Sequence, residues 1–355
     1  MKAAVFEGIE RIVVRDIDTP PCAPDGILVK VEACGICGSD IRNYHAGLKG
    51  DVQRQIMGHE FAGTVAEAGP DVTRFSPGDR VAVAPDVSCG ACEYCRRGWV
   101  NLCVNHRMVG THWPGGFAEY VHLPAEVLSH GMVHPVPDSL DLIDATMSEP
   151  ASSVIAAQRN AGVGEGDTVL VIGDGPIGCL HIEVARARGA RKVVLAGLTR
   201  LKLAAAFEPD LLIDAGSQDT VAETLQATGG LGADIAICAN PVAATQEQAV
   251  EAVRKRGSVV LFGGLPKTKP MTTLNSNLIH YNELRILGAF SYPAECHREA
   301  LELIDRGAVS ARKYITRQVP LDDIVEGLTA AERGEALKVV VRMSPDTGET
   351  HVRHQ

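Results

Sequence analysis

Hydrophobic and polar positions follow two different patterns along this chain of 355 residues. From residue 1 to about 150, short apolar runs alternate with turn-forming residues, for example over 27–32, 63–67 and 79–83. The turn Ser76-Pro77-Gly78-Asp79 lies between two of these runs, and its proline and glycine supply the required backbone angles. This pattern predicts a first domain rich in short β-strands.

From about residue 152, buried strands alternate with amphipathic helices, which is typical of βαβ units on a parallel sheet. A helix is predicted over 176–188, and a capping box at Thr245 and Gln248 predicts the start of another that ends at Gly257. The predicted strands cover 167–172, 192–196, 258–262 and 284–289. We therefore expect an α/β, doubly wound parallel-sheet domain over 152–289.

A glycine-rich turn, Gly173-Asp174-Gly175-Pro176-Ile177-Gly178, joins the first predicted strand to the first helix. Because this G-x-G-x-x-G follows a buried strand and opens a helix, it predicts a dinucleotide-binding Rossmann domain rather than a plain structural turn. Gly173 permits the tight turn, Gly175 lets backbone N–H groups approach a pyrophosphate, and Gly178 lets the helix pack on the strand. Pro176 and Ile177 open the helix, whose N-terminus favours the anion.

The end of the second predicted strand indicates which dinucleotide binds. An NAD site usually has an acid about 20 residues beyond the glycines, but here that position is Gly197 and no acid follows until Glu208. Thr199, Arg200 and Lys202 lie close behind, and such side chains can bind a 2′-phosphate. We therefore expect NADP(H) to be favoured over NAD(H), unless Arg200 stacks on the adenine or faces solvent. Gly197→Asp with Arg200→Ala should then reverse the preference.

Composition narrows the class of protein. Hydrophobic residues at 45% and charged residues at 22% are ordinary for a globular enzyme of about two domains. A formal charge of −10 argues against nucleic acid, because a binder should show a basic patch. The sequence has neither an apolar run long enough for a membrane span nor a signal-like start. We expect a cytoplasmic protein, with no membrane partner, whose ten cysteines are reduced.

Four of these cysteines form the run Cys89-x-x-Cys92-x-x-Cys95-x7-Cys103. Four thiolates satisfy the tetrahedral preference of Zn²⁺ and close a structural site. The two-residue gaps let successive sulfurs turn back onto one ion. The run therefore predicts a structural zinc lobe over about 86–106. Packed reduced cysteines and a zinc-ribbon nucleic-acid module are the alternatives, and the acidic charge opposes the second.

A second constellation lies upstream, where Cys37-Gly38-Ser39-Asp40 is followed by Gly58-His59-Glu60. Cysteine, histidine and carboxylate from separate segments are the ligands of a catalytic zinc that keeps one position open. Taken alone, His59 could be a hydrogen-bonded core histidine and Glu60 a solvated carboxylate. The nearby four-cysteine run makes the metal interpretation specific.

Gly58-His59-Glu60-Phe61-Ala62-Gly63 resembles the catalytic-zinc signature of the zinc-dependent medium-chain dehydrogenases, and the four-cysteine spacing resembles their structural lobe. The resemblance extends from Met1 to about Val341 and is strongest to the sorbitol and threonine dehydrogenase branch. It implies a GroES-like, β-rich catalytic domain over 1–151 and 290–355, beside a Rossmann domain over 152–289. It also implies two zinc ions per chain and a homodimer or homotetramer, commonly built at the sheet edge near 284–289.

The resemblance also implies roles for individual residues. The catalytic zinc would be bound by Cys37, His59 and one or both of Glu60 and Glu149. Asp40 would orient His59, or else only cap a helix that begins near Ile41. Ser39 would accept the substrate proton and pass it toward the nicotinamide ribose.

Two positions depart from the family pattern. Where many relatives have a histidine that completes the proton relay, this chain has Arg42, whose guanidinium stays protonated. Water, Tyr44 or His45 could replace it, although His45 has the character of a surface residue. Ser291 stands where sorbitol dehydrogenases have arginine, which puts sorbitol itself in doubt.

The implied activity is hydride transfer between a nicotinamide cofactor and a secondary alcohol of a polyol, a sugar or an (amino)cyclitol. The side chains expected to contact the substrate are Glu149, His112, Glu119 and Tyr292. An NAD-dependent threonine-type or simple alcohol dehydrogenase is the alternative activity. A catalytically silent cofactor-binding relative is the alternative that is not an enzyme, and the presence of Cys37, His59 and Glu60 counts against it.

Overall fold

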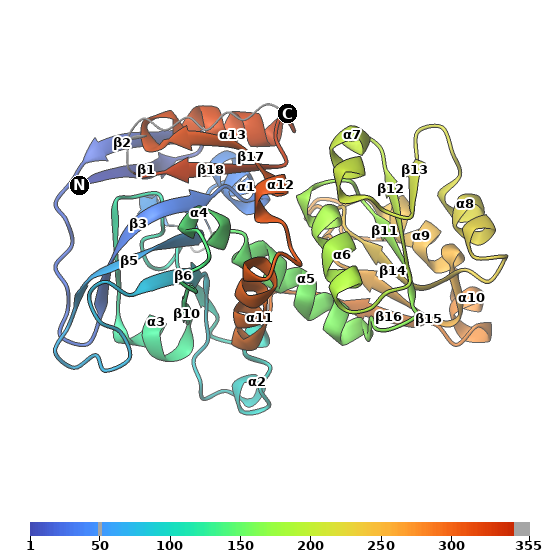
Figure 1. The fold of residues 1–355 in the computed structure, drawn as a ribbon, viewed down its shortest axis with the longest axis horizontal. Helices are drawn as coiled ribbons and strands as arrows, with labels where there is room; N and C mark the ends of the chain where they lie inside the picture. Colours follow the sequence, from blue (N-terminus) through green and yellow to red (C-terminus); the bar gives the residue numbers. More distant parts are fainter. Residues whose placement is uncertain (49–51, 344–355) are drawn as a thin grey trace. The chain divides into compact units, whose positions relative to one another are not determined.

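The computed structural model describes residues 1–48 and 52–343, and the chain divides into two compact units (Figure 1). Unit 1 comprises Met1–Glu149 together with the segment from Tyr314 onwards, and unit 2 comprises Pro150–Lys313. The segment 290–313 thus belongs to unit 2, whereas the sequence analysis expected the chain to leave that domain at residue 290. Residues 344–355 of the expected first domain lie outside the described residues.

Contacts of α11 (Ala294–Asp305) explain why the second unit extends so far. Glu295 and Glu299 on this helix form ion pairs with Arg159 of α5 (Ser148–Ala161), and Glu299 also pairs with Arg188 at 3.6 Å. Beyond α11, the Lys313 ammonium donates a hydrogen bond to the Ala206 carbonyl at 3.2 Å. These contacts all join 294–313 to other parts of unit 2.

Unit 1 is built on a seven-stranded sheet in the order β10-β6-β5-β3-β18-β17, with β9 also paired to β3. The early apolar runs are confirmed as parts of β3, β5 and β6, and their buried residues form the core of this unit. The strands are β3 (Ile27–Gly35), β5 (Glu60–Ala68), β6 (Arg80–Ala84), β9 (Tyr120–Leu123), β10 (Met132–Pro135), β17 (Ile315–Pro320) and β18 (Lys338–Arg342). A three-stranded sheet comprises β1 (Lys2–Gly8), β2 (Arg11–Asp16) and β4 (Gln55–Ile56). The helices are α1 (Gly38–Ala46), α3 (Ala125–His130), α4 (Leu142–Ala145), the 3-10 helix η3 (Leu321–Asp323) and α13 (Ile324–Glu332).

Strand pairing in unit 1 brings distant parts of the chain together. Gly35, the last residue of β3, pairs with Glu60, the first residue of β5. The C-terminal strand β18 runs antiparallel on the other side of β3, with Val340 opposite Gly35. The start of β5, the loop into α1 and the start of β18 therefore meet at one end of the sheet.

The cysteine-rich segment forms a lobe of its own within unit 1. Antiparallel pairing of β7 (Asp86–Val87) with β8 (Arg107–Met108) closes it at the base. Between these strands lie α2 (Glu93–Arg96) and a short 3-10 helix, η1 (Val100–Leu102). The paired strands enclose the segment 88–106, within which the sequence analysis expected the zinc lobe.

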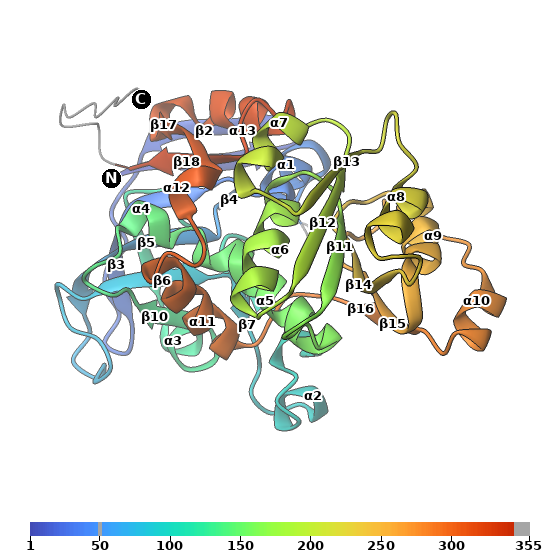
Figure 2. The same cartoon turned by 45° about the vertical axis from the view of Figure 1, so that its right-hand side comes forward.

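Unit 2 contains a six-stranded parallel sheet in the order β13-β12-β11-β14-β15-β16. Helix α6 covers one face of the sheet, and α8 and α9 cover the other, as Figure 2 shows. The strands are β11 (Thr168–Ile172), β12 (Lys192–Gly197), β13 (Leu211–Asp214), β14 (Ala233–Cys238), β15 (Val253–Leu261) and β16 (Arg285–Gly288). The helices are α6 (Pro176–Ala187), α7 (Leu201–Ala204), the 3-10 helix η2 (Ala205–Phe207), α8 (Thr220–Ala227), α9 (Ala243–Ala252), α10 (Ser276–Tyr281) and α12 (Ala311–Tyr314). The doubly wound parallel sheet predicted from the sequence is confirmed.

The expected bounds of α9 are wrong. The helix begins at Ala243, two residues before the proposed capping residue Thr245, and ends at Ala252. The Thr245 hydroxyl donates to Asn240 Oδ1 and to the Val242 carbonyl, both at 2.8 Å, so it does not cap the helix. Gly257 lies inside β15 and does not close a helix.

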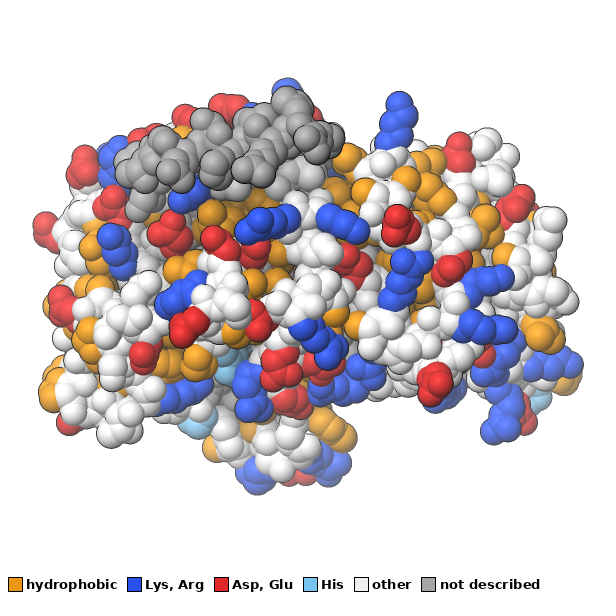
Figure 3. Space-filling view, in the orientation of Figure 1, with side chains coloured by type: hydrophobic (Ala, Val, Ile, Leu, Met, Phe, Trp, Pro, Cys, Tyr) orange, Lys and Arg blue, Asp and Glu red, His pale blue; other side chains and the backbone are white. Residues whose placement is uncertain are grey.

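The surface charges and the lengths of the helices concern the nucleic-acid and membrane partners considered in the sequence analysis. On the face shown in Figure 3, lysine and arginine side chains lie among aspartate and glutamate side chains over both units. Within residues 1–48 and 52–343, no helix combines the length and the apolar character needed to span a bilayer.

Candidate active site

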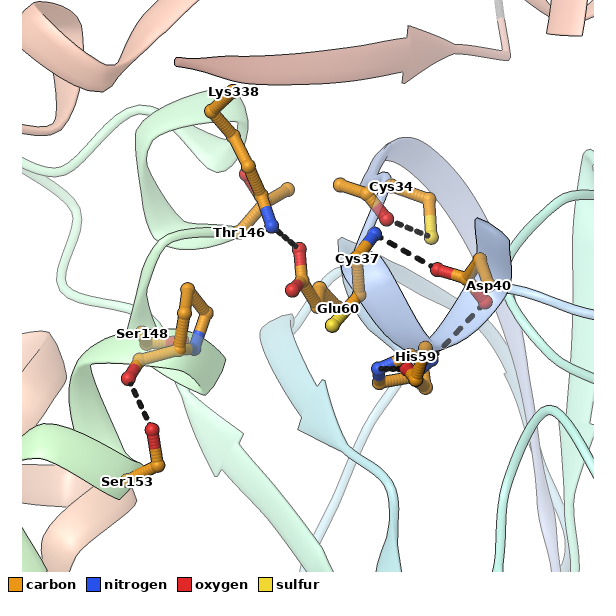
Figure 4. A network of polar contacts seen from close by, with 12 residues as sticks. Cys34, Cys37, Asp40, His59, Glu60, Thr146, Ser148, Ser153 and Lys338 are labelled. Carbon is orange, nitrogen blue, oxygen red and sulfur yellow. Dashed lines mark hydrogen bonds and ion pairs between the residues drawn. The ribbon is translucent and has the colours of Figure 1, made fainter. Parts of the chain in front are cut away.

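Cys37, His59 and Glu60 form a cluster of potential metal ligands in unit 1 (Figure 4). Cys37 precedes α1 and Glu60 opens β5, so the pairing of β3 with β5 brings the two segments together. One ligand atom from each of the three residues lies within 4.8 Å of the others. A single ion between a thiolate, an imidazole and a carboxylate needs such a spacing. His59 and Glu60 are buried, whereas Cys37 is half-buried.

Asp40 lies directly behind His59. Its Oδ1 is 3.3 Å from His59 Nδ1, and its Oδ2 accepts a hydrogen bond from the Cys37 backbone N–H at 2.9 Å. Asp40 is 1% exposed. The same carboxylate therefore caps α1 and holds the imidazole, so both interpretations of Asp40 made from the sequence describe part of its environment.

The other imidazole nitrogen of His59, Nε2, is 3.3 Å from the Ser39 hydroxyl. Burial disfavours the charged imidazolium, but Asp40 and Cys37 outweigh burial and raise the pKa of His59 well above its usual range. A metal ion binds only the neutral imidazole, so a metal ion and a proton compete for His59.

A buried ion pair joins Glu60 to Lys338, the first residue of β18. Glu60 is 0% exposed and Lys338 is 6% exposed. Burial opposes the ammonium charge, but the Glu60 carboxylate more than offsets this and raises the pKa of Lys338. Gly35 makes room for the pair, because a Cβ there would overlap the Glu60 carboxylate. Sequence reasoning missed Lys338, which carries no motif and merely opens an apolar run.

Glu149, the alternative carboxylate ligand, lies in the first turn of α5. Among the described residues, the ligand cluster contains Cys37, His59 and Glu60 but not Glu149. The charge of Glu149 is close enough to contribute to the raised pKa of Lys338. Its charge therefore acts on the ion pair, while Glu60 is the carboxylate within ligand distance of Cys37 and His59.

Cys89, Cys92, Cys95 and Cys103 form a second cluster, with their sulfurs within 4.8 Å of one another. The Sγ of Cys92 is 3.4 Å from that of Cys95 and 4.0 Å from that of Cys103. Tetrahedral Zn–S bonds of about 2.3 Å place sulfurs about 3.8 Å apart, so the cluster fits one ion. Backbone N–H groups of Cys95 and Val104 lower the pKa of Cys92 to about 6, which makes a thiolate available near neutral pH.

The glycine-rich turn of unit 2 has the geometry expected for dinucleotide binding. Gly173 adopts a φ of 133°, which a side chain would strain. A Cβ on Gly178 would overlap the Gly173 carbonyl, so α6 can pack this closely only with glycine at that position. Pro176 and Ile177 form the first turn of α6, as expected.

Asp174, in the middle of this turn, makes a contact that sequence reasoning missed. Its Oδ2 accepts hydrogen bonds from the backbone N–H groups of Leu198, Thr199 and Arg200 at 2.9, 2.8 and 2.6 Å. The Nε of Arg200 is buried and has no hydrogen-bond partner among the described residues. Lys202 lies two residues further on, in α7.

The proposed exchange of Gly197 for aspartate does not fit this geometry. A Cβ on Gly197 would overlap the Asp174 side chain. The substitution would therefore displace Asp174 instead of simply adding a carboxylate at the end of β12. The expected reversal of cofactor preference by Gly197→Asp with Arg200→Ala is withdrawn for that reason.

The residues expected to contact the substrate make hydrogen bonds within the protein or are buried. His112 Nδ1 accepts the Met108 backbone N–H at 3.0 Å, and Glu119 accepts the Lys2 backbone N–H at 2.7 Å. Tyr292 is 1% exposed and belongs to unit 2. Neither His112 nor Glu119 is in the metal-ligand cluster with Cys37, and their contact with a substrate stays a prediction.

The suggested substitutes for the relay histidine make contacts at the surface. His45 lies between Glu10 and Glu332, at 2.9 and 3.1 Å, and these carboxylates raise its pKa. The Tyr44 hydroxyl donates to the Glu10 carbonyl at 3.0 Å. These contacts agree with the surface character expected of His45.

Comparison with known proteins connects this geometry to a family. The alcohol dehydrogenase GroES-like domain model matches residues 23–138, and the zinc-binding dehydrogenase model matches residues 176–306. The sorbitol dehydrogenase of Bacillus subtilis (strain 168) is 34% identical over 96% of this chain and 97% of its own length. The erythritol/L-threitol dehydrogenase of Mycolicibacterium smegmatis is 33% identical, over 96% of both chains.

A solved structure agrees in both fold and sequence. A protein of Sinorhizobium meliloti 1021, described as a zinc-binding dehydrogenase and bound to NADP, superposes with a TM-score of 0.89. It is 34% identical, and the match covers 96% of this chain and 99% of that one. The chain therefore belongs to the zinc-dependent medium-chain dehydrogenases, in the sorbitol dehydrogenase-like branch. It is an NAD(P)-dependent alcohol dehydrogenase with a GroES-like domain and a Rossmann domain, as the sequence resemblance implied.

Proposed function

We propose that this enzyme oxidises a secondary alcohol of a polyol, a sugar or a cyclitol and transfers the hydride to a nicotinamide cofactor. The observation that carries the proposal is the buried cluster of Cys37, His59 and Glu60, with Asp40 behind the imidazole. Relatives over nearly the whole chain are named for sorbitol and for erythritol and L-threitol, which supports the polyol class.

The described residues fit a zinc ion at this cluster. Its donor set of thiolate, imidazole and carboxylate is one that zinc prefers. A zinc ion held by Cys37, His59 and Glu60 would supply Lewis acidity that makes an alcohol hydroxyl easier to ionise. Lys338 shares the Glu60 carboxylate and so limits how much negative charge the site offers to the metal.

The chain's own side chains position the reacting proton. Asp40 holds His59 through Nδ1, so Nε2, which lies 3.3 Å from the Ser39 hydroxyl, is the nitrogen left for a metal ion. The Ser39 hydroxyl would accept the alcohol proton and pass it on by its own O–H, because a hydroxyl both donates and accepts. Arg42 cannot take that proton further, so water completes the relay.

We also propose a second, structural zinc at the four-cysteine cluster, which gives two zinc ions per chain. The sulfur separations and the available thiolate of Cys92 support it. This site offers four protein ligands and no open position, so its role is in folding rather than in turnover.

NADP(H) is the preferred cofactor in this proposal. Gly197 offers no carboxylate at the end of β12, and Arg200 in the same loop has an unpartnered Nε. The NADP-bound relative supports the choice.

The protein assembles as a homodimer or homotetramer in this proposal. Strand β16 is the edge of the parallel sheet, paired only with β15 among the described residues, and so leaves backbone groups open for a second copy. Light scattering at micromolar concentration tests this, and a monomer would refute it.

An activity screen tests the function directly. Sorbitol, erythritol, other polyols, cyclitols, threonine and simple alcohols are each offered with NADP⁺ and with NAD⁺, and reduced nicotinamide is followed by its absorbance. The proposal expects the highest kcat/KM with a polyol or cyclitol and NADP⁺. A best substrate among threonine or simple alcohols would replace the substrate class, and no turnover with any alcohol would contradict the catalytic assignment of the cluster.

A further inference from the structure

The carboxylate of Asp174 occupies a set of backbone donors at the end of β12. Three consecutive N–H groups, from Leu198 to Arg200, point at its Oδ2 within 2.9 Å. Asp174 is 6% exposed, so these bonds are shielded from water. Backbone donors that converge on one oxygen would suit a phosphate oxygen equally well.

This position matters because of where it lies in the Rossmann domain. At the end of the second strand, an acid normally meets the ribose 2′-hydroxyl, or an arginine accommodates a 2′-phosphate. Here the strand ends at Gly197, which has no side chain, and Asp174 fills the space next to it from the glycine-rich turn. The acid absent from the strand end is thus supplied by a different segment.

Arg200 gives the same loop a preference for a phosphate, which is opposite to the effect of Asp174. Its guanidinium is the cation suited to a phosphate, and its buried Nε has no hydrogen-bond partner within 1–48 and 52–343. Asp174 carries the charge that a phosphate would avoid, and it already holds the N–H of Arg200 at 2.6 Å. Two anions cannot share the same three donors, so one must leave when the other binds.

We propose that Asp174 determines cofactor specificity by competing with the 2′-phosphate of NADP(H) for the backbone N–H groups of Leu198, Thr199 and Arg200. The phosphate binds only when the carboxylate swings out of this position, so wild-type affinity for NADP(H) is lower than the loop could otherwise reach. NAD(H) has no phosphate there and leaves Asp174 in place, next to the ribose hydroxyls. The inference rests on the proposed binding of NADP(H) by this loop.

The test compares Asp174→Asn with Asp210→Asn. Asparagine at 174 keeps one acceptor oxygen for the loop while removing the charge. Asp210 is the matched control, because its carboxylate accepts the Val193 N–H at 2.7 Å at the other end of β12. Asp174→Ser is a second variant, short and neutral, in case the asparagine disturbs the turn. Dissociation constants for NADPH and NADH are measured by nucleotide fluorescence, and thermal unfolding verifies that each variant is folded.

Removing the charge should raise the ratio of the NADH to the NADPH dissociation constant by about tenfold to hundredfold, the effect of about one charge-assisted hydrogen bond. Asp210→Asn should leave the ratio unchanged. An unchanged or lower ratio in folded Asp174→Asn and Asp174→Ser would overturn the inference. The wild-type ratio tests the proposed NADP(H) preference separately. Tighter NADH binding in the wild type would contradict that preference. The change in the ratio caused by Asp174→Asn would still test the competition.

Discussion

Replacing Lys338 with methionine should strongly destabilise unit 1. The substitution keeps most of the side-chain volume but removes the ammonium group that pairs with Glu60. Because Glu60 is 0% exposed, its carboxylate would remain in the interior without a counter-charge. Breaking a buried pair in this way costs about 3–5 kcal/mol. For a unit of this size, 1 kcal/mol corresponds to about 2–4 °C, so the Tm should fall by about 6–20 °C.

Calorimetry of metal-free protein measures this change, because a zinc ion at Cys37, His59 and Glu60 would itself supply a counter-charge to Glu60. Zinc content is determined on the same samples. Lys2→Met is the matched control, because Lys2 forms the same kind of ion pair with Asp322 in the same unit. The Lys2 and Asp322 side chains are 46% and 56% exposed, so solvent screens this pair and its loss should change the Tm little. Adding Glu60→Gln to Lys338→Met should recover much of the loss, because the unpaired charge is then gone. Equal Tm values for Lys338→Met and Lys2→Met would refute the reasoning.

Two further predictions concern His181 and Cys92. Burial lowers the pKa of His181 to about 3 from an ordinary value of 6.5, so the unfolded chain binds the proton more readily and stability falls as the pH drops below 6.5. Between pH 7 and pH 5 the loss is about 2 kcal/mol, and urea unfolding of His181→Asn should lack this component. Cys92→Ser should remove one zinc and lower the Tm, whereas Cys22→Ser, outside both clusters, should do neither.

Each of these has an outcome that contradicts it. If His181→Asn and the wild type lose the same stability between pH 7 and pH 5, the buried imidazole does not contribute the expected pH dependence. If Cys92→Ser keeps the zinc content and the Tm of the wild type, the four sulfurs do not hold a structural ion.

The metal clusters could be predicted because their signals are local. Cys92 and Cys95 are separated by two residues, so their sulfurs can meet whatever the rest of the chain does. The Cys37 and His59 segments needed only the common pairing of two neighbouring strands, β3 and β5. For such sites, the residue types and their short spacing in the sequence are enough to predict the cluster.

Lys338 could not be predicted, because its partner is far away in the sequence. Only the pairing of β18 with β3 brings it to Glu60, and a lysine at the start of an apolar run gives no sign of this. Asp174 was missed for another reason. The usual Rossmann pattern has an acid at the end of the second strand, whereas this carboxylate reaches that place from the preceding glycine-rich turn.

The zinc content and polyol oxidation rate of Cys37→Ala, measured on one sample, test the central claim most directly. Cys37 belongs to the cluster assigned to the catalytic metal and lies outside the four-cysteine lobe. Zinc should fall from two ions per chain to one and turnover should be abolished, while NADPH affinity and the Tm stay close to those of the wild type. Full activity with both zinc ions retained would contradict the assignment of Cys37, His59 and Glu60 as the catalytic centre.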